Sequence, residues 1–117
     1  MTRIDYMLKI YCSDERMSQV SKVLGVDPTE VQHGYWGLEV SDEEIADGVD
    51  AVGRVLGLLD GKFEDLERIG VARSDVSIWL FVEYQGQCSL LFTAQDLCRI
   101  AEKKLDLCIE CWEVSAG

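Results

Sequence analysis

Few side chains in this sequence could carry acid–base or nucleophilic chemistry. His33 is the only histidine, so a histidine general base would have to be this residue. Its neighbours Tyr35 and Trp36 could line a pocket with it, although a histidine exposed on a loop is the more common situation. The motifs of serine hydrolases, phosphate-binding loops and dinucleotide-binding loops are absent from the sequence. We therefore predict no catalytic residues, and we keep a small-molecule or metal-binding regulatory domain with a pocket near His33 as the alternative function.

Thiols are the second group that could do chemistry, and the sequence has five: Cys12, Cys88, Cys98, Cys108 and Cys111. Their number is odd, and each falls in a predicted strand or helix, which is typical of free thiols in cytosolic proteins. Cys108 and Cys111 have the spacing of a zinc or redox pair, but residues three apart on a strand point to opposite faces. The sequence also offers no second cysteine pair to complete a zinc site. We therefore predict neither a metal nor another cofactor.

Carboxylates outnumber basic side chains by two to one. The chain of 117 residues has 22 acidic and 11 basic residues, a formal net charge of −11. Because nucleic acids and anionic membranes attract cationic surfaces, we expect neither as a direct partner. Clustered charge of one sign speeds encounter with an oppositely charged partner, so we predict a basic protein partner. The predicted contact residues are Asp42, Glu43, Glu44, Asp47, Asp50, Glu64, Asp65 and Glu67.

Two alternatives to this acidic contact surface stay open. The acidic residues could be the solvated face of a helix that only aids solubility. An exposed strand edge could instead provide the contact, because a partner strand can extend a sheet there.

Strands are predicted wherever apolar side chains alternate along the chain. This alternation occurs over residues 4–12, 35–40, 76–84, 88–92 and 105–114. The segments 76–84 and 88–92 are joined at Gln85-Gly86-Gln87 and are expected to form a hairpin. Trp79 and Phe81 place large apolar groups on the second face of segment 76–84, which favours a central strand. In the last strand, we expect Leu107, Ile109 and Cys111 to face inward.

Helices are predicted where apolar residues recur every three or four positions. The first ends at Gly25, and the segment 27–30 could begin a short helical turn. A Ser41-x-x-Glu44 capping box then opens one long helix that carries most of the acidic cluster and ends at Gly61. A shorter helix over 62–69 follows, and Thr93 caps a last one.

The resulting order of elements is β-α-β-α-β-β-α-β. Helices mixed with a hairpin predict a single α+β domain over residues 1–117, a two-layer sandwich with a mostly antiparallel sheet and helices mainly on one face. No apolar run approaches the roughly 20 residues needed to span a bilayer. The start of the chain lacks the layout of a signal peptide, so we expect a cytoplasmic location.

Two runs of the sequence resemble a known family. The first is Leu24-Gly25-Val26-Asp27-Pro28-Thr29 with His33-Gly34 and Trp36. The second is Leu91-Phe92-Thr93-Ala94-Gln95-Asp96-Leu97 with Ile100-Ala101 and the segment 105–109. Together they are similar to a family of small bacterial α+β domains of unknown function, a resemblance that implies no catalytic residues.

In its general character, short and acidic, the chain also resembles immunity proteins of the contact-dependent growth inhibition type. That resemblance implies a function as a toxin inhibitor. Such proteins bind a cognate toxin domain, often a basic nuclease, and occlude its active site.

Overall fold

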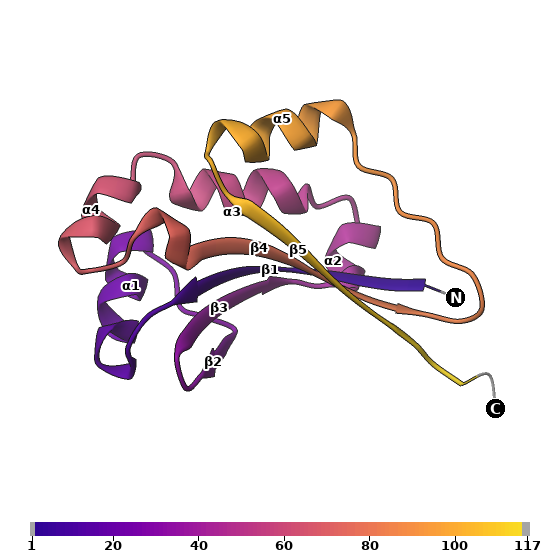
Figure 1. The fold of residues 1–117 in the computed structure, drawn as a ribbon, viewed down its shortest axis with the longest axis horizontal. Coiled ribbons are helices and arrows are strands. Elements are labelled where there is room, and N and C mark those ends of the chain that lie inside the picture. Colours follow the sequence, from indigo (N-terminus) through magenta and orange to yellow (C-terminus); the bar gives the residue numbers. More distant parts are fainter. Residues whose placement is uncertain (1, 116–117) are drawn as a thin grey trace.

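A five-stranded sheet and five helices make up the fold in the computed structural model, which describes residues 2–115 (Figure 1). The elements are β1 (Thr2–Tyr11), α1 (Met17–Leu24), β2 (Glu30–Gln32), β3 (Tyr35–Val40), α2 (Asp42–Ala46), α3 (Ala51–Leu59), α4 (Phe63–Arg68), β4 (Val76–Tyr84), α5 (Ala94–Glu102) and β5 (Asp106–Glu113). The strand order is β2-β3-β1-β4-β5, and only β4 and β5 run parallel. The predicted α+β class and mostly antiparallel sheet are confirmed.

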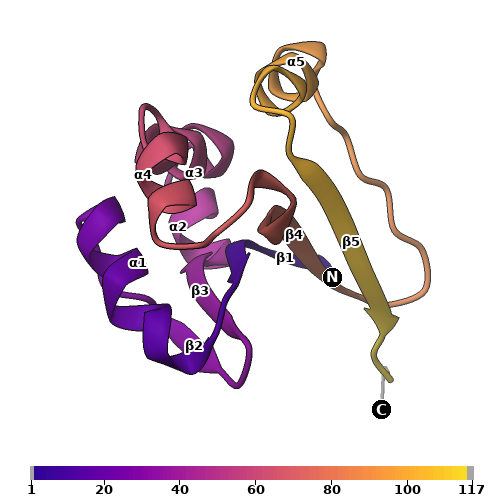
Figure 2. The ribbon, with the colours of Figure 1, turned by 60° about the vertical axis from the view of Figure 1, so that its left-hand side comes forward.

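Strand β1 lies in the middle of the sheet, and its side chains point alternately to the two faces of the sheet. Leu8 and Ile10 are fully buried and join the core formed with the helices. Lys9 and Tyr11 point to the other face, because successive side chains of a strand alternate. All helices of residues 2–115 contribute to the layer on the core side, so no helix of this part of the chain lies over the opposite face of the sheet (Figures 1 and 2).

The long helix predicted between Ser41 and Gly61 is two helices in the structure. Its start is as predicted, since Ser41 Oγ accepts a hydrogen bond from the Glu44 N–H at 3.3 Å. The helix then ends at Ala46, because Gly48 adopts a φ of +98°, a left-handed conformation that interrupts helical geometry. Asp50 begins α3 by accepting a hydrogen bond from the Gly53 N–H at 3.0 Å. The acidic residues of the predicted long helix therefore lie in α2 and in the segments that flank α3, while α3 itself contains none.

The predicted hairpin between 76–84 and 88–92 is wrong. The edge of β4 that would receive the returning strand is occupied by β5, which pairs with it in parallel along its whole length. Residues 88–92 remain extended and none of them pairs with the sheet. Cys88, Leu90 and Phe92 still pack against the core, which explains the apolar alternation in the sequence.

The antiparallel hairpin of the structure lies earlier in the chain. Strands β2 and β3 form it through the turn at residues 33–34. The segment 27–30, predicted to begin a helical turn, instead leads into β2. The observed order therefore differs from the predicted β-α-β-α-β-β-α-β in the place of the paired strands, while the class is the same.

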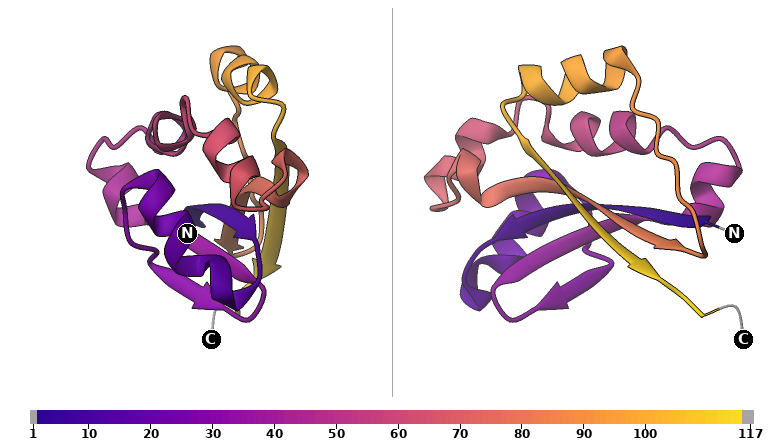
Figure 3. Two further views of the ribbon diagram at one scale, coloured as in Figure 1. Left: turned by 90° about the vertical axis from the view of Figure 1, so that its left-hand side faces the viewer. Right: turned by 45° about the vertical axis from the view of Figure 1, so that its right-hand side comes forward.

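The burial predicted for the last strand is only partly correct. Leu107, Ile109 and Cys111 do share the face on the helix side, as their register with β4 requires. Leu107 packs against the core, but Ile109 is 43% exposed and Cys111 is also exposed. Helix α5 lies over the start of β5 and the strand then runs away from it (Figure 3). The second half of β5 is therefore accessible on both faces.

Candidate functional site

The side of the sheet opposite the helices is the candidate site, and we call it the open face. Its members follow from the strand registers, because paired residues of neighbouring strands point to the same side. They are Glu30, Gln32, Tyr35, Gly37, Glu39, Arg3, Asp5, Met7, Lys9, Tyr11, Ser77, Trp79, Phe81, Glu83, Asp106, Cys108, Glu110 and Trp112.

Aromatic rings gathered around Lys9 form the centre of the open face. The Lys9 ammonium lies 4.2 Å from the ring centroid of Trp79, 4.3 Å from that of Tyr35 and 5.3 Å from that of Tyr11. Trp79 also stacks on Phe81, with 6.0 Å between ring centroids. Cations over aromatic faces are attracted by the ring quadrupole, so Lys9 holds the three rings together.

A hydrogen bond fixes the largest of these rings. The Trp79 Nε1–H donates to Ser77 Oγ at 2.9 Å, from one open-face residue of β4 to the next. A ring held in one orientation loses little conformational entropy when a partner covers it. The aromatic centre is therefore a preorganised contact surface.

Carboxylates surround this aromatic centre. The open face has six acidic residues, and its only basic residues are Arg3 and Lys9; the six are Glu30, Glu39, Asp5, Glu83, Asp106 and Glu110. Arg3 is engaged with Asp5, Nε to Oδ2, at 3.2 Å. The pKa of Glu39 is raised above its ordinary value, mainly by burial and next by the nearby Asp5 carboxylate.

Tyr35 links the aromatic centre to the acidic rim. The pKa of its phenol is raised, mainly by burial and next by a hydrogen bond to Glu30. Its hydroxyl thus places a polar group at the edge of the aromatic centre. Tyrosine, tryptophan and a charged rim are the composition of protein interfaces.

None of the eight acidic residues predicted as the contact surface is a member of the open face. They form two groups, and Asp42 of the first group borders the open face, where its N–H donates to Asp5 Oδ1 at 2.8 Å. The first group has Asp42, Glu43 and Glu44 in α2, with Asp47 and Asp50 in the break between α2 and α3. The second group is Glu64, Asp65 and Glu67 in α4. These groups lie at opposite ends of α3 (Figure 1). The structure therefore does not bring the eight residues into one patch.

Most of these eight carboxylates already have partners within the chain. Asp42 Oδ1 accepts a hydrogen bond from the Ile4 N–H at 2.8 Å, and Glu44 pairs with Arg54. Asp50 pairs with Arg99 at 3.2 Å. Glu64 and Asp65 both pair with Arg68, each at 3.0 Å. Within residues 2–115, Glu43, Asp47 and Glu67 alone of the eight have no ion pair or side-chain hydrogen bond.

The predicted pocket near His33 does not form with the residues named for it. His33 is 95% exposed, and its Nδ1 lies 2.9 Å from Asp14 Oδ2. Tyr35 and Trp36 are adjacent on β3 and point to opposite faces, so they cannot line one pocket. Trp36 is fully buried in the core, where its Nε1–H donates to Ser21 Oγ at 2.9 Å.

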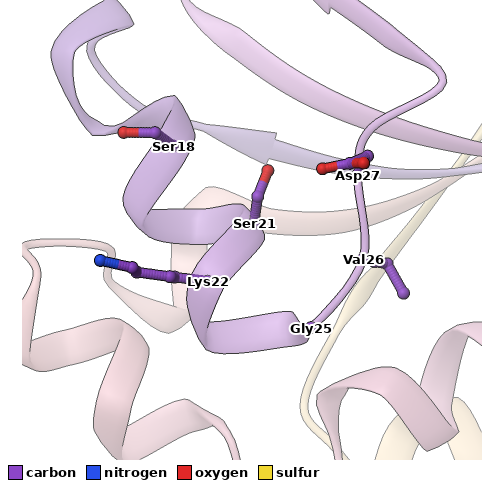
Figure 4. A pocket seen from close by; sticks show the side chains of 6 residues that line it. All are labelled: Ser18, Ser21, Lys22, Gly25, Val26 and Asp27. Atoms are coloured by element: carbon purple, nitrogen blue, oxygen red, sulfur yellow. The ribbon is translucent and has the colours of Figure 1, made fainter.

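A hollow of about 450 Å³ lies at the end of α1, lined by Ser18, Ser21, Lys22, Gly25, Val26 and Asp27 (Figure 4). The Lys22 side chain points away from Ser21 and Asp27, so the polar groups do not converge on one point. No group of three or more potential metal ligands occurs among residues 2–115. Cys108 and Cys111 face opposite sides of β5, as predicted from their spacing.

None of the helices in the described part of the chain is long and apolar enough to cross a bilayer. Comparison with protein-family models, curated proteins and solved structures gives no match. Function is therefore inferred from the residues of the open face themselves.

Proposed function

We propose that this protein binds a basic protein partner on its open face and neutralises that partner, as an immunity protein neutralises a toxin domain. The observation that carries the proposal is the aromatic centre around Lys9, left without a covering layer and ringed by six carboxylates. Interfaces combine a central set of aromatic anchors with a polar rim, and this face has both.

The mechanism follows from the chemistry of the two zones. Tyr35, Trp79 and Phe81 bury apolar surface against the partner and supply most of the affinity. The carboxylates around them pair with lysine and arginine side chains of the partner and fix its orientation. In a nuclease, such basic side chains hold the nucleic-acid backbone, so a protein that pairs with them excludes the substrate.

The free carboxylates on the helices have a secondary part in this proposal. Glu43, Asp47 and Glu67 are not members of the open face, yet they add to the net charge of −11. Charge outside a contact zone raises the association rate and has little effect on dissociation. The predicted acidic surface thus steers the partner, and the open face holds it.

A pair of matched charge reversals tests this division. Glu39→Lys changes the open face, and Glu67→Lys makes the same change in net charge on α4. Glu39→Lys is compatible with the fold, because the new ammonium would lie near the Asp5 carboxylate that now repels Glu39. The partner to titrate is the C-terminal domain encoded by the gene immediately upstream. We expect about a tenfold loss of affinity for Glu39→Lys and less than threefold for Glu67→Lys.

The opposite ranking would contradict the proposed surface. A larger loss with Glu67→Lys would place the contact on the helices, and equal losses would mean that only net charge matters. Circular dichroism of both variants verifies that each is folded before the titration.

A further inference from the structure

The outer edge of β5 is the second unusual surface of the molecule. β5 is an edge strand of eight residues whose only neighbour in the described chain is β4. Its register with β4 runs through eight consecutive pairs without a bulge. Along the outer edge, half of the backbone N–H and C=O groups of a regular strand point away from the sheet and can pair with another strand.

Proteins usually protect such an edge, and the sequence and register of β5 lack the devices that do so within a strand. Lysine, proline, a bulge or a covering loop are the common devices, and β5 has no lysine, no proline and no bulge. Ile109 and Trp112 are each 43% exposed, on opposite faces of the strand. A strand with exposed apolar side chains and free backbone groups is a template for strand addition.

We propose that the outer edge of β5 accepts an extended segment of the basic partner, which pairs with it as a sixth strand. The inference rests on the proposed function, since it states how the partner docks. The charge of β5 selects this occupant: Asp106, Glu110 and Glu113 are its only charged residues. A segment in which lysine or arginine alternates with apolar residues places its cations beside Asp106 and Glu110, which share the open face.

A second copy of the chain is the competing occupant, and the same charges disfavour it. If two β5 strands paired side by side, the four carboxylates of Asp106 and Glu110 from the two copies would share one face of the joined sheet, and β5 supplies no cation to balance them. Like charges directly opposite on neighbouring strands are destabilising. Pairing between the β5 edges of two copies is therefore disfavoured, and the backbone groups of the edge stay available for a basic segment.

An added strand would also be continuous with the open face. Glu110 lies beside Phe81 and Trp112 beside Glu83 in the β4–β5 register, so the edge borders the acidic rim. A partner that contacts the aromatic centre could therefore place a neighbouring segment along β5 without leaving the surface. Main-chain hydrogen bonds would then fix the register of the complex, and side chains would select the partner.

The test uses the full chain and two synthetic peptides. The first is an acetylated octapeptide of alternating lysine and valine, and the second is its twin with every other backbone nitrogen methylated. The twin has the same charge but cannot complete the ladder of hydrogen bonds. Amide hydrogen exchange and chemical shifts are followed by NMR across residues 106–113 during each titration.

We expect the first peptide to slow exchange within β5 and the methylated twin to bind at least tenfold more weakly. Glu110→Lys should abolish binding of the first peptide, whereas Glu67→Lys should leave it within a factor of three. Equal affinity of the two peptides would overturn the proposal, because charge alone would then explain binding. So would a β5 spectrum unchanged at millimolar peptide, or a dimer that protects β5 amides without peptide.

Failure here is distinguishable from failure of the proposed function. The peptides probe β5 alone, whereas the Glu39→Lys titration probes a residue of β3, which is separated from β5 by β1 and β4 in the strand order. A partner domain that binds through Glu39 while the peptides do not bind would leave the proposed function intact and remove only strand addition.

Discussion

Lys9 is the residue on which the open face depends. Its ammonium contacts three aromatic rings contributed by three strands, β1, β3 and β4. A lysine on a sheet surface usually extends into solvent, because its charge is well hydrated. Here the rings hold it across the sheet, and it in turn keeps them side by side for a partner.

Replacing Lys9 measures this contribution. Lys9→Met keeps the length of the side chain and removes the charge, and it should lower the free energy of unfolding by about 0.5–1 kcal/mol. Lys22→Met is the control, because Lys22 forms no ion pair or ring contact within residues 2–115. Urea unfolding of both variants gives the comparison. Equal stability of the two would mean that the ring contacts of Lys9 contribute nothing.

Two carboxylates that cap the ends of α3, Asp50 and Asp60, should make stability depend on pH. The Arg99 guanidinium, with help from the Gly53 N–H, holds the pKa of Asp50 below its ordinary value. Lys103 does the same for the pKa of Asp60. Because these folded-state pKa values are depressed, the contribution is complete above the unfolded pKa of about 4 and is lost as pH falls through the lower folded values.

Thermal melts between about pH 5 and pH 2 test this linkage. The wild type should lose Tm steeply over that range, and Asp50→Asn should show a shallower decline from a lower starting value. Asp47→Asn is the control, since Asp47 has no partner among the described side chains. A wild-type slope retained in Asp50→Asn would show that the Arg99 pair does not link α5 to α3 energetically.

At the scale of the element, glycines have opposite effects at two positions. Gly48 ends α2 with a φ of +98°, whereas Gly57 lies inside α3. A Cβ added at either position meets nothing within 4 Å, so only backbone conformation distinguishes them.

Alanine substitutions at these two glycines should change the stability of the protein in opposite directions. Gly48→Ala should destabilise the protein by about 1–2 kcal/mol, because alanine is strained in the left-handed region. Gly57→Ala should stabilise it by about 0.5–1 kcal/mol, because glycine is a poor helix former. Denaturant unfolding measures both changes. Two changes of the same sign would be incompatible with a helix break at Gly48.

Elements with a regular alternation could be predicted from the sequence, and elements decided by tertiary pairing could not. Strands β1, β3 and β4 were expected within two residues of their observed limits, because each has one face in the core. The segment 88–92 has the same alternation yet no partner strand, since β5 takes the edge of β4. Alternation reports which side chains are buried, but it does not report where the backbone hydrogen bonds are made.

The candidate site could not be predicted from the sequence for a related reason. Trp79 and Phe81 were interpreted as burial on both faces of a central strand, and β4 does lie between two strands. Whether a second layer covers that face depends on where the helices pack, which periodicity does not encode. The acidic cluster was more visible because its residues are close in sequence. Their ion pairs with Arg54, Arg68 and Arg99 come from tertiary structure or helix spacing.

At the scale of the whole molecule, the net charge of −11 and the open face have separate roles in binding. Long-range charge acts on the encounter rate and is screened by salt, whereas desolvated contacts act on dissociation. The double variant Glu43→Lys with Asp47→Lys should therefore slow association and flatten its salt dependence, with dissociation unchanged. Glu39→Lys should mainly speed dissociation. Stopped-flow association between about 20 and 200 mM salt separates the two. An unchanged association rate in the double variant would show that Glu43 and Asp47 do not contribute to association.

Hydroxyl-radical footprinting of the chain, alone and with the upstream-encoded C-terminal domain, tests the central claim most directly. The method measures the accessibility of side chains on both faces of the wild-type protein in one experiment. The account predicts that Tyr11, Tyr35 and Trp79 lose reactivity in the complex. It also predicts that Leu91, which is 89% exposed, and Leu97 on α5 keep theirs. Tyrosines that stay reactive while the leucines become protected would contradict it and place the partner on α5 and the segment that precedes it.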